Sequence, residues 1–222
     1  MTTLSSMSRG RVVNSEELGD LWLEWQHLRH NNPEMFGLKS TGISKLNQMF
    51  GGGIELGQFV VVGGADKSGK STLLLNIAKA FGEQGVNSLY LSAEMNVLQM
   101  GNMLFSRYSC VSRSKMRGLH LTDTDWSILE DSRAKIANLT IAWSDGLSTM
   151  ENIFAVKDDI EQSTGNAIRA IFIDYFQLME SPSLSKRNRP EELAWLSRKA
   201  KSITLTSSTE PIAVIAAAQL NR

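Results

Sequence analysis

The chain is poor in residues that cross-link or stiffen a small protein. Its 222 residues include a single cysteine, Cys110, and only four prolines. One thiol can form neither an internal disulfide nor a cysteine-rich zinc site, as expected for a protein of the reducing cytoplasm. No apolar run approaches the ~20 residues that a membrane-spanning helix needs, and the N-terminus lacks the apolar core of a secretory signal. These absences predict a soluble intracellular protein with no membrane partner.

The chain also lacks an excess of charge of either sign. Lysine plus arginine and aspartate plus glutamate each number 23, so the formal net charge at pH 7 is zero. Bulk charge therefore gives no indication of a nucleic-acid partner, and any such contact must come from a local basic patch. The length suffices for one sizeable α/β domain with a short appendage.

The most informative motif is a glycine-rich loop. The residues Gly64-Ala65-Asp66-Lys67-Ser68-Gly69-Lys70-Ser71 fit the pattern G-x-x-x-x-G-K-[ST]. Loops of this kind direct backbone N–H groups at phosphate oxygens, and the glycines permit the tight turns and close approach that this requires. Lys70 would add a cation near the outer phosphates, and the Ser71 hydroxyl could ligate Mg²⁺.

The residues on either side of the loop support this interpretation. The apolar run 58–63 is typical of a buried strand that enters the loop. The run 72–81 is typical of a helix whose positive N-terminal end points at a bound anion. The alternative is a plain glycine-rich turn between two elements. Motif and flanks together predict a site for a nucleoside triphosphate.

Segments typical of strands and helices alternate from Thr41 onward, which indicates a parallel sheet covered on both faces. The expected strands are Gln58–Gly63, Ser88–Ser92, Leu139–Ala142, Ala170–Asp174 and Ile212–Ala217. The expected helices are Lys70–Gln84, Val97–Cys110, Asp123–Ala137, Met150–Ser163 and Glu191–Ser207. In the third helix we expect Asp123 or Thr122 to cap the N-terminus, with Trp126 and Ile128 as apolar anchors.

A further helix is expected before this alternation begins. It would run from Ser15 to about His30 and stop at Asn31-Asn32-Pro33. One face is apolar and contains Leu18, Leu21, Trp22, Trp25 and Leu28. This face either packs on the chain's own core or docks on a neighbouring subunit as a linker helix. The expected division is a flexible N-terminus with the linker helix at 1–36 and a core domain at 37–222.

Three polar residues stand at the ends of expected strands, where open parallel sheets bind their ligands. Glu94 could take a proton from the water that attacks a terminal phosphate, or could be an acid in the first turn of the next helix. Asp174 closes an apolar strand as a Walker B carboxylate does, so it is expected to hold Mg²⁺, with a helix cap as the alternative. Gln219 could sense a γ-phosphate through its amide, although a strand-end glutamine alone is a weak signal.

The segment 183–190 is basic, polar and without periodicity. It contains Lys186, Arg187 and Arg189. These residues could form a mobile loop that follows a nucleic-acid backbone, or an ordinary solvated loop. Because no aromatic residue interrupts the segment, base stacking is not indicated.

Several motifs together resemble the RecA-type ATPase domain of DnaB-family replicative DNA helicases. They are Thr41-Gly42-Ile43 with Leu46 and Gly51-Gly52-Gly53, the glycine-rich loop, Leu91-Ser92-Ala93-Glu94-Met95, Ile173-Asp174-Tyr175-Phe176-Gln177-Leu178-Met179, and Gln219-Leu220-Asn221-Arg222. The resemblance extends from about Thr41 to the last residue. It implies a RecA-like P-loop NTPase core and a hexameric ring that uses ATP to move along single-stranded DNA. It also implies contacts with other replication proteins in the cytoplasm of a bacterial or phage-infected cell.

The resemblance also implies roles for individual residues. Glu94 would be the catalytic base, Asp174 the Walker B acid that binds Mg²⁺ together with Ser71, and Gln219 the γ-phosphate sensor. The nucleotide would be held by Gly64, Ala65, Asp66, Lys67, Ser68, Gly69, Lys70, Ser71 and Thr72. The DNA-contacting loop would contain Lys186, Arg187 and Arg189.

Two features depart from the family pattern. The residues of the glycine-rich loop are closer to those of strand-exchange recombinases. The chain also stops at Arg222, before the family's arginine finger and further strands, so an excised fragment or a short natural form is expected. A recombinase or regulatory RecA-like ATPase stays open as an alternative function. So does a nucleotide-binding assembly module with little turnover.

Overall fold

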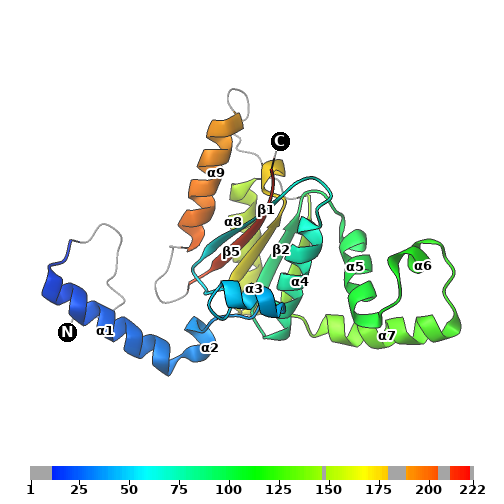
Figure 1. Cartoon of the computed structure of the whole chain (residues 1–222), viewed down its shortest axis with the longest axis horizontal. Helices are drawn as coiled ribbons and strands as arrows, with labels where there is room; N and C mark the ends of the chain where they lie inside the picture. The colour runs from blue at the N-terminus through cyan, green and yellow to red at the C-terminus, as the bar shows by residue number, and fades with distance from the viewer. Residues whose placement is uncertain (1–11, 147–148, 180–188, 205–210, 221–222) are drawn as a thin grey trace.

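The centre of the molecule is a five-stranded parallel sheet with the order β1-β5-β4-β2-β3 (Figure 1). This computed structural model describes residues 12–146, 149–179, 189–204 and 211–220, apart from the side chains of Met35, Arg189 and Pro190. The strands are β1 (Phe59–Gly64), β2 (Ser88–Ser92), β3 (Ile141–Asp145), β4 (Ala170–Asp174) and β5 (Ala213–Gln219). Because all strands run in one direction, their carboxyl ends meet at one edge of the sheet.

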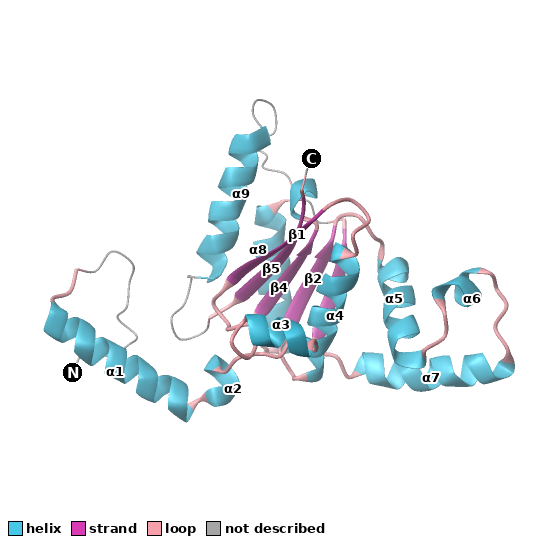
Figure 2. Ribbon diagram, viewed as in Figure 1, coloured by secondary structure: helices cyan, strands magenta, loops and turns pink. Residues whose placement is uncertain are grey.

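Helices cover both faces of the sheet (Figure 2). One face packs against α4 (Lys70–Glu83) and α5 (Val97–Ser109), and the other against α8 (Met150–Thr164) and α9 (Arg189–Thr204). Successive residues of β4 alternate between the two resulting cores: Phe172 meets the α4 side, while Ile171 and Ile173 meet the α8 and α9 side. Burial on both faces explains why the strands are continuous apolar runs, and the expected α/β fold is confirmed.

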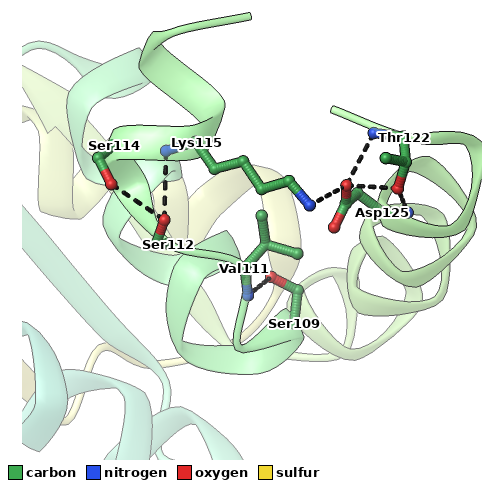
Figure 3. Close-up of polar contacts among 7 residues, drawn as sticks. All are labelled: Ser109, Val111, Ser112, Ser114, Lys115, Thr122 and Asp125. Carbon is green, nitrogen blue, oxygen red and sulfur yellow. Dashed lines mark hydrogen bonds and ion pairs between the residues drawn. The ribbon is translucent and has the colours of Figure 1, made fainter. Parts of the chain in front are cut away.

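Between β2 and β3 the chain leaves the sheet as a helical excursion. It consists of α5, the short α6 (Arg113–Arg117) and α7 (Asp123–Ala137), which lie beyond the β3 edge (Figure 1). Thr122 caps α7 in a capping box with Asp125, whose carboxylate also pairs with Lys115 of α6 at 2.5 Å (Figure 3). This ion pair ties α6 to the start of α7.

The prediction that Trp126 and Ile128 anchor α7 in the core is wrong. Trp126 is 56% exposed and Ile128 38% exposed, whereas Leu129 is buried. The face of α7 that is buried contains Asp125, Leu129 and Ser132, and this helix packs against α5, so Trp126 and Ile128 lie beside the buried face and not on it.

The N-terminal segment stands away from the sheet (Figure 1). It contains α1 (Ser15–Asn31) and α2 (Pro33–Phe36), followed by α3 (Ser44–Met49). None of the α1 residues is buried, so packing of this helix on the chain's own core, one of the two interpretations, is wrong. Its attachments are an edge-to-face contact of Trp25 with Phe36, with ring centroids 5.0 Å apart, and an ion pair of Arg29 with Glu55.

Several expected boundaries shift. The strand expected at 139–142 runs from Ile141 to Asp145, because the α7 C-cap turn still includes Leu139, whose N–H bonds to the Ile136 carbonyl. Likewise β5 continues to Gln219, which pairs with Gly64 of β1. The short helices α2, α3 and α6 and the 3-10 turn η2 (Phe176–Leu178) were not expected. In the part of the chain that the structure describes, no helix combines the length and apolar content that a bilayer crossing demands.

Candidate functional site

The glycine-rich loop connects β1 to α4 at the carboxyl edge of the sheet. Gly69 is the N-cap of α4 and has φ of +91°, a conformation that glycine adopts without strain. A Cβ atom on Gly64 would lie 2.6 Å from Ser68 Oγ, so a side chain here would force Ser68 to move. The backbone conformation thus favours glycine at position 69, and close packing favours it at position 64.

The N-terminal end of α4 opens toward this loop. The Leu73 N–H donates to the Gly69 carbonyl at 2.9 Å. The N–H groups that precede such a bond have no partner within a helix, and with the helix dipole they favour an anion. The Lys70 side chain extends back to the loop, where its Nζ donates a hydrogen bond to the Ala65 carbonyl at 2.7 Å. An anion at this position would meet both backbone donors and the lysine.

Asp174 lies at the end of β4 and faces the loop. Its Oδ1 accepts a hydrogen bond of 3.0 Å from the Ser71 hydroxyl, and its Oδ2 accepts one of 3.2 Å from the Tyr90 hydroxyl. The residue is only 1% exposed. Burial raises the pKa of the Asp174 carboxyl, while the hydrogen bonds from Ser71 and Tyr90 and the charge of Lys70 act against this rise. Burial also raises the pKa of Tyr90 far above its ordinary value.

A hydroxyl and a carboxylate that face one another supply the oxygen ligands preferred by Mg²⁺. Ser71 and Asp174 are 103 residues apart in the sequence. Strand order brings them together, since the loop after β1 delivers Ser71 and β4 delivers Asp174 to the same edge of the sheet. The residues present thus fit a hard divalent cation beside an anion-binding loop.

Glu94 lies two residues beyond the end of β2, the strand that pairs with β4. Ser92, the last residue of β2, pairs with Asp174, and the Ala93 N–H donates to the Asp174 carbonyl at 2.8 Å. The Glu94 side chain is exposed. Helix α5 begins only after its N-cap Asn96, so the alternative interpretation of Glu94 as an acid in the first turn of that helix is wrong.

Gln219 ends β5 opposite the first residue of the loop. It pairs with Gly64, and the following Leu220 N–H donates to the Gly64 carbonyl at 3.0 Å. Gln177, in the η2 turn after β4, holds the Gln219 backbone from both sides. Its Oε1 accepts from the Gln219 N–H at 2.9 Å, and its Nε2 donates to the Gln219 carbonyl at 2.7 Å. The Gln219 backbone is thereby fixed next to the loop.

The structure adds three residues that sequence reasoning did not assign to the site. Tyr90 supports Asp174, Gln177 supports Gln219, and Asp145 at the end of β3 accepts from the Val97 N–H of α5 at 3.0 Å. A tyrosine between two leucines in the middle of a strand was the available signal for Tyr90. The other two act on backbone groups, and sequence carries no sign of such contacts.

The expected basic loop cannot be compared with this geometry. Lys186 and Arg187 lie outside the described residues. Arg189 begins α9, but its side chain also lies outside the description.

Comparison with known proteins agrees with the fold and the motifs. A sequence profile of the DnaB-like helicase C terminal domain matches residues 37–222. The replicative DNA helicase DnaB of Leifsonia xyli subsp. xyli (strain CTCB07) is 29% identical over 196 residues, which cover 87% of this chain and 41% of that protein. Three such relatives are matched over only 41% to 42% of their own length, so the chain spans well under half of them.

Solved structures share the same architecture. One, described as an ATPase domain, superposes with a TM-score of 0.78 at 21% identity, over 97% of this chain and 73% of that chain. A DnaB-like replicative helicase, described with its interactions with primase, superposes with a TM-score of 0.76 at 19% identity, over 95% of this chain and 50% of that chain. These likenesses establish the fold, and the profile that spans most of the sequence establishes the family. The chain belongs to the DnaB-like helicase C-terminal domain family.

Proposed function

We propose that this chain is the ATP-driven motor domain of a replicative DNA helicase. The observation that carries the proposal is the hydrogen bond between Ser71 of the glycine-rich loop and Asp174 at the end of β4, at 3.0 Å. It joins an anion-binding loop to a buried carboxylate in a chain of the DnaB-like family. That juxtaposition is what the binding of a magnesium nucleotide requires.

The nucleotide would be held by the segment from Gly64 to Thr72. Backbone N–H groups of the loop and of the first turn of α4 would bind the phosphates, and Lys70 would exchange its bond to the Ala65 carbonyl for a phosphate oxygen. Ser71 and Asp174 would hold Mg²⁺, which neutralises charge on the phosphates when bound.

Hydrolysis would depend on two further strand ends. Glu94 is exposed and lies next to Asp174, so it could orient the attacking water and accept its proton. The Gln219 amide would donate to the terminal phosphate and lose this bond when the phosphate leaves. Gln177 holds the Gln219 backbone and shortly precedes the segment that contains Lys186, Arg187 and Arg189. A movement of Gln219 on phosphate release could therefore change the position of this segment on bound DNA.

We infer the partners of this chain from the descriptions of the similar proteins. Those proteins are replicative DNA helicases, and one solved relative is described with primase. For this chain we propose single-stranded DNA, other replication proteins and further copies of the chain in a hexamer. The proposed division is the linker segment 1–36 and the ATPase core 37–222. The exposed apolar residues Leu18 and Trp22 of α1 are available to a neighbouring subunit.

Lys70→Ala tests the nucleotide site. Loss of a charged hydrogen-bond donor to phosphate should weaken binding of Mg-ATP about tenfold to a hundredfold, measured by fluorescence of a labelled ATP analogue. Lys79→Ala is the matched control, because it removes the same charge from the same helix at a lysine that pairs with Glu83. Equal affinities of the wild-type protein and Lys70→Ala would show that the nucleotide binds elsewhere.

Mass measurement in solution, with and without ATP and DNA, separates the motor from its alternatives. A hexamer supports the helicase, a filament supports a recombinase-like ATPase, and a nucleotide-bound monomer that does not turn over supports an assembly module.

A further inference from the structure

Tyr90 brings a polar group into the most enclosed part of the sheet. It lies in the middle of β2 and is fully buried. Its ring lies between aromatic neighbours, with centroids 5.3 Å from Trp143 and 6.0 Å from Phe172. A buried hydroxyl is unfavourable unless it is hydrogen-bonded, and this one donates to Asp174 Oδ2 at 3.2 Å.

The two oxygens of Asp174 therefore have separate partners. Oδ2 is held inside the sheet by Tyr90, and Oδ1 faces Ser71 of the glycine-rich loop at 3.0 Å. Because Oδ2 is held by the Tyr90 hydroxyl, the Asp174 carboxyl group cannot rotate freely about its Cβ–Cγ bond. Oδ1 is then kept directed at the loop.

We propose that Tyr90 is a positioning residue for the carboxylate that binds the divalent cation. This inference rests on the proposed nucleotide site. If Ser71 and Asp174 hold Mg²⁺, lone pairs of the Ser71 hydroxyl and of Oδ1 would serve as ligands, so the 3.0 Å contact between these two oxygens would be free to change. The bond from Tyr90 is made to the other oxygen and is kept. Tyr90 is thus the anchor that holds the carboxylate in place while the contact with Ser71 changes.

If Tyr90 served only to fill the core, its ring would be needed and its hydroxyl would not. Phenylalanine would fill the same space between Trp143 and Phe172, so packing alone does not require the hydroxyl. Tyr108 offers a matched comparison elsewhere in the protein. Its hydroxyl donates to Glu83 Oε1 at 2.8 Å, at the opposite end of α4 from the glycine-rich loop. Both tyrosines bond a carboxylate, but only Tyr90 bonds one that faces the loop.

The test compares Tyr90→Phe and Tyr108→Phe with the wild-type protein. Binding of a fluorescent ADP analogue is measured in EDTA and then across a Mg²⁺ titration, which needs no turnover. In Tyr90→Phe we expect metal-free affinity to stay within about twofold and the apparent Kd for Mg²⁺ to rise about tenfold, as for loss of a hydrogen bond to a charged group. Tyr108→Phe should leave both quantities unchanged. In an Asp174→Asn background, Tyr90→Phe should cause no further change in the apparent Kd for Mg²⁺.

The outcomes separate this inference from the proposed function. An unchanged Mg²⁺ Kd in Tyr90→Phe, with metal-dependent binding intact in the wild-type protein, overturns the role of Tyr90 alone. An undiminished effect in the Asp174→Asn background does the same. A Tyr90→Phe protein that melts far below Tyr108→Phe but keeps the wild-type Kd for Mg²⁺ makes the hydroxyl a stability contact alone and also rejects the inference. Absence of any Mg²⁺-dependent nucleotide binding in the wild-type protein overturns the nucleotide site itself.

Discussion

Two carboxylates, Asp174 and Glu94, lie at neighbouring strand ends in opposite surroundings. Asp174 is 1% exposed and hydrogen-bonded through both oxygens, whereas Glu94 is exposed to solvent. A buried and fixed carboxylate suits a metal ligand, while an exposed one can reach water and exchange its proton. The environment, not the residue type, separates the two proposed roles.

Glu94→Gln tests this division. The amide keeps the size of the side chain but cannot accept a proton, so the ATP turnover number should fall about 10²-fold to 10⁴-fold. Binding of Mg-ATP should stay within about twofold, since Asp174 and the glycine-rich loop are untouched. Steady-state phosphate release and analogue fluorescence measure the two quantities, with Glu130→Gln on α7 as a control of equal charge. Turnover at the wild-type rate would remove Glu94 from the base role.

Asp125 illustrates a carboxylate that stabilises structure. The hydrogen bond from Lys115, with those from Thr122, lowers its pKa from the ordinary 3.8 to about 2 (Figure 3). A carboxyl whose pKa is depressed by folding stabilises the fold above its unfolded pKa, and this contribution is lost as the pH falls. Here the loss should occur between about pH 4 and pH 2.

NMR titration of the Asp125 carboxyl checks this assignment. In the wild-type protein the midpoint should be at about 2. In Lys115→Met it should rise toward 3.8, because the strongest cause of the depression is removed. Lys135→Met removes the same charge from the last turn of α7 and should leave the midpoint in place. Equal midpoints in both variants would rule out Lys115 as the cause.

At the scale of elements, α7 shows that an apolar side chain need not anchor its helix. Leu129→Ala should lower the free energy of unfolding by about 2–4 kcal/mol, because it leaves a cavity at a buried position. Trp126→Ala should lower it by less than about 1 kcal/mol, since this side chain is more than half exposed. Urea unfolding followed by circular dichroism measures both. A larger loss in Trp126→Ala would mean that α7 packs through its tryptophan face.

In the N-terminal helix, too, the apolar side chains do not show what the helix packs against. The helix α1 is well specified locally, by the Asn14 capping box and by a stop before Pro33, yet none of its residues is buried. Caps determine where a helix begins and ends, and they leave open what its apolar face contacts. Docking of this face on a neighbouring subunit stays a prediction.

At the scale of the whole molecule, zero net charge confines any DNA contact to local patches. If Lys186, Arg187 and Arg189 each contact a phosphate, replacing all three with alanine should reduce the slope of log K against log salt by about 2 units. Fluorescence anisotropy of single-stranded DNA across a salt series measures this slope. Arg107, Arg113 and Arg117 are three exposed arginines of the α5–α6 excursion, and their replacement is the control of equal charge. Equal slopes for both triple variants would reject a DNA role for the basic loop.

The sequence by itself determined the features that depend on near neighbours. The glycine-rich loop depends on Gly69, whose positive φ favours glycine, and on Gly64, where a Cβ atom would lie 2.6 Å from Ser68 Oγ. The strands β2 and β4 were predicted to the residue, because a short apolar run buried on both faces has one interpretation in an alternating α/β pattern. Glu94, Asp174 and Gln219 were selected because polar groups at strand ends meet at one edge.

Only the tertiary structure decided what those elements contact. The order β1-β5-β4-β2-β3 brings Ser71 to Asp174 across 103 residues and places Tyr90 beneath that carboxylate. In the folded protein Trp126 is more than half exposed, and the Gln177 side chain bonds the Gln219 backbone. Apolar periodicity shows which face of an element avoids water, and it carries no information on which distant segment covers that face.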